Sequence, residues 1–527
     1  MTFLDVAVLG TARQSSSGVP QTGTPVDALV EALGPVGNEA ALLLKAGALA
    51  VYRMAGHQAL TAIQVPPRAP DDQLPEPSAA GARLLRELIE RGDAGLLCEA
   101  LPRLRSGGCR VPTSQLPAAL DLNGAGVRDA LAPVLGERGR WLAQFRSDWR
   151  WAIESTTTDA ASSAEAERVW QEGSVEARGV ALRAARNADP ERARAWIEAV
   201  WAEEKSERRA DWLRVLSIRL APADEQLLER ALDDRSQVVR AVAAELLARL
   251  PESDLARRIA DRADGLLSYR AATGAWARVK SKVTGAPPGE LDAKPPPSLE
   301  ASWERDGIPA RPPKGIGERA HWLAALLALV PPGHWEERFS ASAADLVPAA
   351  WAGEWGFAVT LGWSRAALLF AERGWMAPLW DRWLHTRLDG AEAVVQREIL
   401  RLLLQGMERA SAEARVVDVM RDPPSGDLLG AGEAVALLAG PWGDVLARTY
   451  LDILEDQVRA KEPALEFLRQ TGPHAALAIP PDCFARAMKL VQLAEPAGGG
   501  SSPWKKPLEA FTDVVQLRRR IHEELPT

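Results

Sequence analysis

Between residues 172 and 261, similar residues return at a fixed offset of 31 positions. In each interval an apolar helical segment runs to a break at Pro or Ala-Pro, and a second apolar helical segment follows. A single helical hairpin cannot bury its own apolar face, so such hairpins stack on one another. The pattern therefore predicts an all-α chain containing an α-solenoid. The aligned residues are Glu172, Glu203 and Asp234; Arg178, Arg209 and Arg240; and Ile197, Leu228 and Ile259.

The charged positions of this repeat should lie at the same height in successive hairpins. We therefore predict a ladder of ion pairs, with Glu203 and Asp234 near Arg209 and Arg240. Partly exposed pairs contribute only about 0–1 kcal/mol each, so the ladder would set register more than stability. A second interpretation stays open, in which the arginines line a groove for an acidic peptide or a nucleic-acid backbone. The ladder comprises Glu172, Arg178, Glu203, Arg209, Asp234 and Arg240.

At 527 residues the chain is too long for one compact core. Composition shifts and proline-rich stretches divide it, and no segment alternates at period two as a half-buried strand would. A second helical domain, rich in Trp, follows the repeats. The predicted parts are an N-terminal helical segment (1–65), helical hairpins (81–153), repeats (165–280), a Pro-rich connector (281–317), the Trp-rich helical domain (318–495) and a last helix (508–525).

Within the N-terminal segment, Asn38 to Met54 is the strongest helical stretch. Asn38 can cap its N-terminus. We expect the apolar residues at helical spacing to form the face of this helix that packs. That set is Ala41, Leu44, Ala48 and Val51.

The net charge and the cysteines limit which partners and which cellular compartment are expected. The formal net charge of −8 argues against a general nucleic-acid binder, which usually carries a basic domain. The three cysteines show no CxxC spacing, as expected in a reducing cytosol. Ala320 to Val330 is the longest apolar run and is too short to cross a bilayer. We expect a cytoplasmic protein without membrane or nucleic-acid partners.

No arrangement of residues in the sequence predicts catalysis. The six His residues contain no HxxxH or HExxH spacing, and no serine lies in a GxSxG motif. The loop from Leu9 to Gly18 (LGTARQSSSG) contains Arg13 and hydroxyl groups that could bind an anion. It lacks the Gly-Lys-Ser/Thr ending of a P-loop, so an ordinary loop is the favoured interpretation. We expect no enzyme, no cofactor and no metal site.

Eight of the 19 Trp residues fall between Trp322 and Trp383. Large amphipathic rings are favoured at protein interfaces, but they also fill helical cores. Core packing is the favoured interpretation and a ligand or partner groove is the alternative. The candidate interaction surface is Trp351, Trp355 and Trp363, together with Arg13.

Three segments carry a resemblance to a known family: LGTARQ (9–14), WAEEKSERRADWL (201–213) and ALDDRSQVVRAVAAELLARLP (231–251). The third, with Asp234, Val239 and Arg240 before a Leu-rich helix, resembles the HEAT repeat. Together they resemble an uncharacterised bacterial domain-of-unknown-function family, number 5691. The resemblance implies an all-helical protein of no assigned activity. It also implies relatives encoded beside a MoxR-type AAA ATPase, a von Willebrand factor A (VWA) protein and a SWIM zinc-finger protein.

Three functions are compatible with these observations. The leading hypothesis is a non-enzymatic HEAT-like scaffold or adaptor that binds proteins, with a MoxR-type ATPase or a VWA protein as the implied partner. The alternative is a HEAT-like DNA-repair glycosylase or another nucleic-acid-binding solenoid, which would need a basic concave face. The third is a solenoid that binds a ligand in a pocket lined by Trp351, Trp355 and Trp363.

Overall fold

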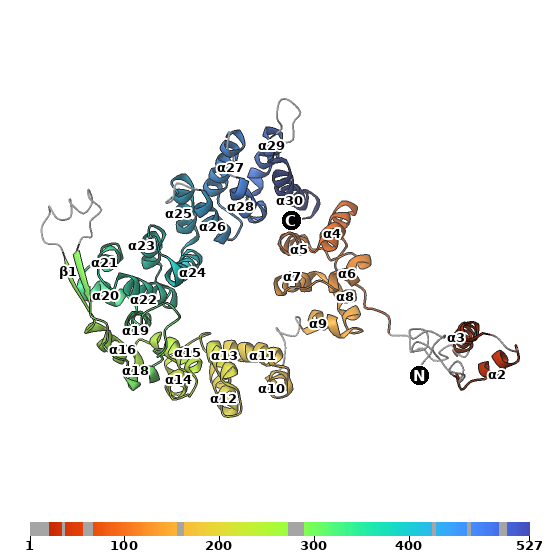
Figure 1. The fold of residues 1–527 in the computed structure, drawn as a ribbon, viewed down its shortest axis with the longest axis horizontal. Coiled ribbons are helices and arrows are strands. Elements are labelled where there is room, and N and C mark those ends of the chain that lie inside the picture. Colours follow the sequence, from red (N-terminus) through yellow and green to blue (C-terminus); the bar gives the residue numbers. More distant parts are fainter. Residues whose placement is uncertain are drawn as a thin grey trace. The chain divides into compact units, whose positions relative to one another are not determined.

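The computed structural model describes residues 21–33, 37–55, 67–154, 163–271, 289–423, 428–460, 465–494 and 503–526. These residues are mainly helical, which confirms the all-α class (Figure 1). Their two strands, β1 (Leu267–Ala271) and β2 (Gly289–Ala293), form an antiparallel hairpin. This hairpin was not predicted, because five residues are too few to establish a period of two. The chain divides into two compact units, Met1–Ala69 and Pro70–Thr527.

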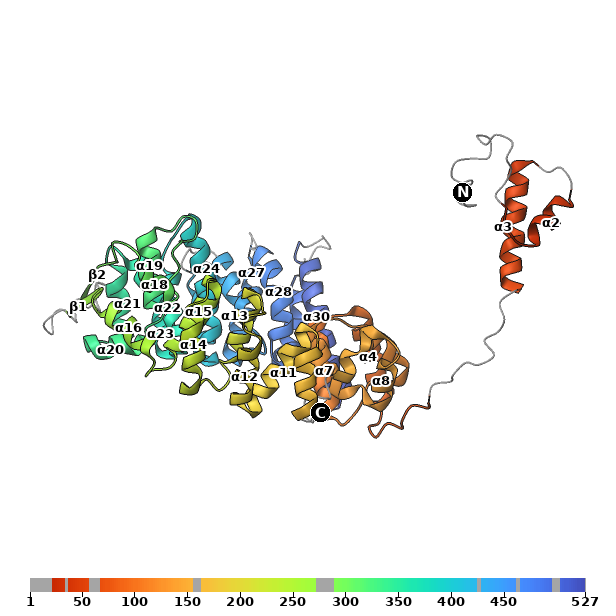
Figure 2. The same ribbon diagram turned by 90° about the horizontal axis from the view of Figure 1, so that it is seen from below.

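The first unit contains α2 (Val26–Glu31) and α3 (Asn38–Ala55), which lie against each other (Figure 2). Asp27 of α2 pairs with Lys45 of α3 at 3.3 Å. The prediction for the apolar face of α3 was wrong: Leu44 and Val51 are exposed. Since this helix carries apolar residues on two opposite sides, periodicity alone does not select the face that packs. The face that is buried consists of Leu42, Lys45 and Leu49.

The second unit begins with helices whose boundaries follow from their capping residues. The Ser78 hydroxyl accepts a hydrogen bond from the Gly81 N–H at 3.1 Å at the start of α4. Gly92, with φ +64°, ends α4, and the Asp93 carboxylate caps α5. The helices here are α4 (Ala79–Arg91), α5 (Ala94–Ser106), α6 (Leu116–Leu120), α7 (Ala125–Leu131), α8 (Gly136–Ala143) and α9 (Trp151–Glu154).

The repeat region forms helical hairpins in which alternate helices touch: α11 contacts α13, and α13 contacts α15. A buried ion pair joins two of the hairpins, because Arg186 of α11 reaches Asp224 in the turn that precedes α14. The helices are α10 (Ser163–Glu172), α11 (Val175–Ala188), α12 (Pro190–Val200), α13 (Ser206–Val215), α14 (Glu225–Ala231), α15 (Gln237–Ala248) and α16 (Asp254–Asp264).

The segment predicted as an extended connector, 281–317, is packed over its described part. It contains β2 and α18 (Ala301–Arg305), and Ile308 is fully enclosed at 1% exposure. Asp306 is also buried and binds Arg258 at 2.9 Å and Arg262 at 2.7 Å. The prolines therefore shape a tight path along the repeats and do not separate two domains.

The remaining helices form two rows. In one row α22, α24, α26, α28 and α30 contact one another in succession; the other contains the contacts of α25 with α27 and of α27 with α29. The helices are α19 (Glu318–Leu327), α20 (Pro332–Phe339), α21 (Ala343–Trp351), α22 (Gly356–Leu369), α23 (Arg373–Leu384), α24 (Gly390–Gly406), α25 (Arg409–Arg421), α26 (Leu428–Leu437), α27 (Asp444–Arg459), α28 (Leu465–Ala478), α29 (Phe484–Leu493) and α30 (Lys505–Glu524).

The last helix joins two hydrophobic clusters. Leu508 and Val515 of α30 belong to the cluster that starts in α10, whereas Ile521 belongs to the cluster formed by α4–α9. Arg518 pairs with Glu99 of α5 at 2.5 Å and also donates to two carbonyls at the end of α28. The hairpins of residues 79–154 are thus held by α30.

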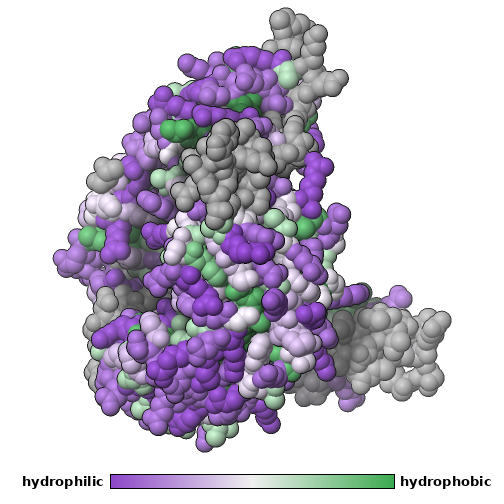
Figure 3. Space-filling view, turned by 90° about the vertical axis from the view of Figure 1, so that its left-hand side faces the viewer, coloured by the Kyte–Doolittle hydropathy of each residue, from purple (hydrophilic) through white to green (hydrophobic). Residues whose placement is uncertain are grey.

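The apolar side chains lie mainly inside these layers. Figure 3 shows a face on which hydrophilic side chains predominate and hydrophobic ones gather in small patches. Within the described ranges, none of the helices has both the length and the apolar character needed to cross a membrane.

Candidate binding groove

The charged residues of the repeat form ion pairs between successive hairpins, with one change of partner. Arg209 binds Asp234 at 2.8 Å. Arg178 binds Glu204 at 2.8 Å, so Glu204 takes the place expected for Glu203. Glu204 can reach Arg178 because it is half-buried in the turn before α13, whereas Glu203 is exposed to solvent.

The ion pair of the third repeat arginine, Arg240, connects the repeats to the segment that follows them. Arg240 donates to the Asp234 carbonyl at 2.8 Å and pairs with Glu304 of α18 at 3.1 Å. Glu172 is exposed and makes no ion pair within the described residues. The arginines are thus engaged in contacts between layers of the fold and are not lined up on an open surface.

The tryptophans of the second half are mostly core residues. Trp363 has no exposed surface, which contradicts its assignment to an interaction surface. Its ring packs edge-to-face on Trp375 at 5.2 Å between centroids. Trp351 and Trp355 are half-buried, and Trp355 lines a hollow of about 350 Å³ beside β2 that neither of the other two lines. Arg13 lies outside the described residues.

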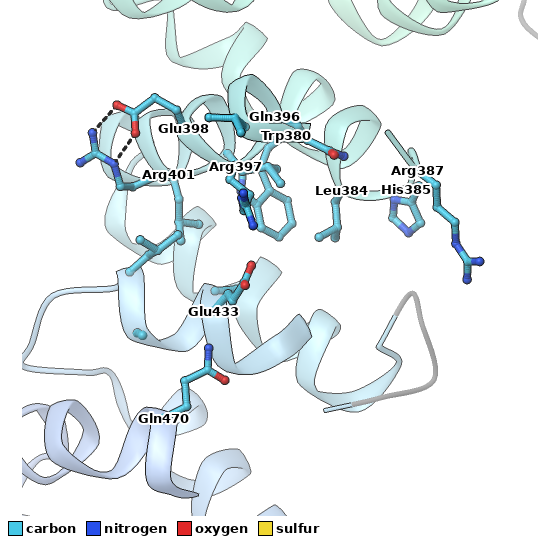
Figure 4. Close-up of a pocket in the computed structure, with 16 residues that line it drawn as sticks. Trp380, Leu384, His385, Arg387, Gln396, Arg397, Glu398, Arg401, Glu433 and Gln470 are labelled. Carbon is cyan, nitrogen blue, oxygen red and sulfur yellow. Dashed lines mark hydrogen bonds and ion pairs between the residues drawn. The ribbon is translucent and has the colours of Figure 1, made fainter. Parts of the chain in front are cut away.

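A larger groove, of about 890 Å³, lies among α23, α24, α26 and α28 (Figure 4). Its apolar lining comes from three of these helices, and Val394 of α24 is 58% exposed there. Trp380 closes the bottom and is itself buried. The apolar lining residues are Trp380, Leu384, Val394, Leu400, Leu404, Ala434, Ala436 and Leu437.

Charged side chains surround this apolar lining. Arg401 forms a two-point contact with Glu398, at 2.5 and 3.0 Å, and the paired guanidinium lowers the pKa of that carboxyl. Arg387, Arg397 and Glu433 make no ion pair or hydrogen bond within the described part of the chain. Figure 4 shows Arg397 extending from α24 toward the side on which Glu433 lies. With the Arg401–Glu398 pair neutralised, the rim retains two arginines and one glutamate, so it carries a surplus positive charge.

The groove is held in shape by the turn between α23 and α24. Gln396 donates through one amide nitrogen to the carbonyls of Trp383 at 2.6 Å and Thr386 at 2.7 Å. The start of α24 needs Gly390, whose φ of +59° favours glycine. These contacts fix the direction in which α24 leaves α23 and therefore the width of the groove.

The face of α24 toward the groove has a regular composition. Val394, Arg397, Arg401 and Leu404 are spaced by three, four and three residues, so they lie on one side of the helix. This groove was not predicted, because its lining contains neither a catalytic motif nor a cluster of aromatic residues. The signal was an apolar stripe interrupted by arginines, which can be found in the sequence, although the facing helices cannot.

Neither in this groove nor elsewhere do the described residues contain a cluster of three side chains suited to hold a metal ion. Burial raises the pKa of the Cys483 thiol, which keeps it in the less nucleophilic form. The same holds for Cys98, whose pKa is raised by burial and by Asp129.

A comparison with family models places the chain. The model of a family of unknown function, DUF5691, matches residues 2–525. The chain belongs to this family. No curated protein and no solved structure matches it. The family carries no assigned activity, so the argument for a function of this DUF5691 member rests on its own residues.

Proposed function

We propose that this DUF5691 member is a HEAT-like α-solenoid scaffold that acts by binding proteins rather than by catalysis. Two rows of helices, in which alternate helices touch, support the solenoid assignment. The ion pairs that run from Arg178, Arg209 and Arg240 to the following layer support it as well. Such folds present extended surfaces, and the surface proposed for binding is the groove of α23–α28.

The observation that carries the proposal is the composition of the groove. Apolar side chains at its bottom offer burial to an apolar residue of a partner, as in proteins that receive an amphipathic helix in a groove. Arg387 and Arg397 at its rim are without ion pairs in the described residues and can bind carboxylates through charge-assisted hydrogen bonds. The occupant that fits is an amphipathic helix of a partner protein, with apolar anchors and acidic residues beside them.

A MoxR-type ATPase or a VWA protein is the partner we propose to test first. Its motivation is the gene neighbourhood that the family resemblance implies. The proposal is specific: one of these proteins contains an acidic amphipathic helix that enters the groove. Val394 would contact its apolar residues, and Arg397 a carboxylate.

The test is affinity capture of the full chain and of four variants from the native host, followed by binding measurements with the purified partner. Val394→Asp and Arg397→Glu should each weaken binding at least tenfold, because the first places a charge on the apolar lining and the second reverses the rim charge. Val445→Asp and Arg373→Glu are matched controls: Val445 is 65% exposed on α27, Arg373 is exposed at the start of α23, and neither lines the groove. Equal binding by all five proteins would assign the partner to another surface.

The nucleic-acid alternative finds no support in this groove. A glycosylase holds a flipped base against aromatic side chains. Trp380, the tryptophan of the groove, is only 2% exposed and offers no ring face for stacking.

A further inference from the structure

Helix α3 has two apolar faces on opposite sides. One face, with Leu42 and Leu49, is buried within the N-terminal unit. The opposite face carries Leu43, Val51 and Met54, which are 73%, 60% and 67% exposed. Exposed apolar residues this close together are typical of an interaction site.

The exposed face has the pattern of a helix–helix seam. Its central residues are separated by three, four, three and four positions, which is the spacing of the a and d positions of a coiled coil. Leu44 and Val51 flank this line on one side. Small residues occupy the middle of this line and large residues lie on either side of it, so a second helix can approach closely at the centre. The central residues are Ala40, Leu43, Gly47, Ala50 and Met54.

The seam is nearly symmetric about Gly47, which lies at the middle of α3. Counting outward from Gly47, Leu43 corresponds to Val51 and Ala40 to Met54. A Cβ atom placed on Gly47 would have no atom of the described residues within 4 Å, so no contact in that part of the chain requires a glycine there. The absent side chain permits two helix backbones to approach closely at that point.

The charges along the edge of the seam fit an antiparallel arrangement. Glu39 and Arg53 lie near opposite ends of α3 and on the same edge of the exposed face. Two antiparallel copies bring the same edges together. Glu39 of one copy would then lie beside Arg53 of the other, in the manner of the flanking charges of coiled coils.

We propose that α3 is the dimerisation helix of this protein, and that it pairs with α3 of a second copy in an antiparallel arrangement whose twofold axis passes at Gly47. The seam is self-complementary, as a twofold interface requires. A helix of 18 residues is only about 27 Å long, so one pair of helices buries less surface than a standard permanent interface. We therefore expect a reversible dimer whose population depends on the protein concentration.

Cysteine crosslinking of the full chain tests the axis directly. The background is Cys98→Ser, which removes the exposed native thiol. Gly47→Cys should give a covalent dimer on oxidation, because the two copies of this position meet at the axis. Met54→Cys should give none: its two copies lie about 21 Å apart in this arrangement, at 1.5 Å per residue, far beyond the ~7 Å that a disulfide spans between Cα atoms. Mixing Ala40→Cys with Met54→Cys should restore the crosslink.

Sedimentation equilibrium gives a second, independent measurement. Leu43→Asp should weaken dimerisation at least tenfold, because it buries a charge in the seam. Leu29→Asp is the matched control, since Leu29 of α2 is 66% exposed and lies off the seam. A wild-type chain that remains monomeric at about 100 μM overturns the proposal. So does a Met54→Cys crosslink as efficient as that of Gly47→Cys, which would mean a parallel pair.

Discussion

Arg186 is the residue whose replacement most directly tests how the repeats are held together. Its side chain has no exposed surface, and its partner Asp224 has none either. The five N–H groups of the guanidinium lie within hydrogen-bond distance of six acceptor oxygens, and these contacts link α11 to two later turns. The acceptors are both carboxylate oxygens of Asp224 and the carbonyls of Pro190, Leu216, Ile218 and Arg219.

Replacing Arg186 by methionine keeps the unbranched apolar part of the side chain but removes the guanidinium, which leaves a buried carboxylate short of charge compensation. Asp224 would retain the Arg194 guanidinium at 3.0 Å and the Ala221 N–H at 2.9 Å. Breaking one side of a buried pair typically costs about 3–5 kcal/mol. Arg194→Met should cost about 1 kcal/mol or less, because Arg194 is partly exposed and Arg186 still neutralises the carboxylate.

Native-state hydrogen exchange shows which helices lose stability in the variant. Amides of α11–α14 in Arg186→Met should exchange roughly two to four orders of magnitude faster, since each 1.4 kcal/mol is about a factor of ten. Amides of α27–α29 should be unchanged, because they share no contact with the pair. If Arg186→Met and Arg194→Met accelerate exchange by the same factor, the assignment of Arg186 as the main partner of the buried carboxylate is refuted.

Three further predictions concern other parts of the chain. Hydrogen bonds from the Thr22 backbone and neighbouring groups lower the pKa of Asp27 from 3.8 to about 2, so its stabilising effect is present above pH 4 and is lost toward pH 2. Pepsin should therefore cut α2–α3 increasingly as the pH falls over that range. Asp27→Asn should remove this pH dependence. Gly362→Ala should destabilise by about 1–3 kcal/mol in thermal unfolding, because its Cβ would meet the Ala324 carbonyl of α19 at 2.9 Å, whereas Gly374→Ala, with open space around it, should be neutral or slightly stabilising. Arg518→Leu should accelerate hydrogen exchange in α4 and α5, because Glu99 would lose its guanidinium partner; unchanged exchange there would show that apolar contacts alone hold α30.

The helical character and the repeat could be predicted because both are local. The offset of 31 residues placed Arg209 and Asp234 in facing registers, and they are in contact. The exchange of Glu203 for Glu204 shows the limit of such an alignment, since a shift of one residue in a turn decides which carboxylate faces inward. The packed path of residues 289–317 could not be predicted, because its contacts, such as Asp306 with Arg258, depend on side chains of other layers.

The same limit applies to the groove. The helix of Val394 and Leu404 and its stripe could be recognised from spacing alone. The facing wall, with Glu433 and Gln470, comes from helices whose position depends on the stacking of α24, α26 and α28. Neither composition nor periodicity indicates how close these helices lie to one another, so the groove could be recognised only from the three-dimensional structure.

The contact between Arg518 and Glu99 spans 419 positions of the sequence. During synthesis at about 5–20 residues per second, the α4–α9 cluster would wait about 20–80 s on the ribosome before Ile521 and its neighbours emerge to cover it. In that interval the apolar residues that later receive Ile521 are open to solvent and to chaperones. A chain cut before α30 would therefore keep an uncovered apolar surface on α4–α9, although all the helices of that cluster had already been made.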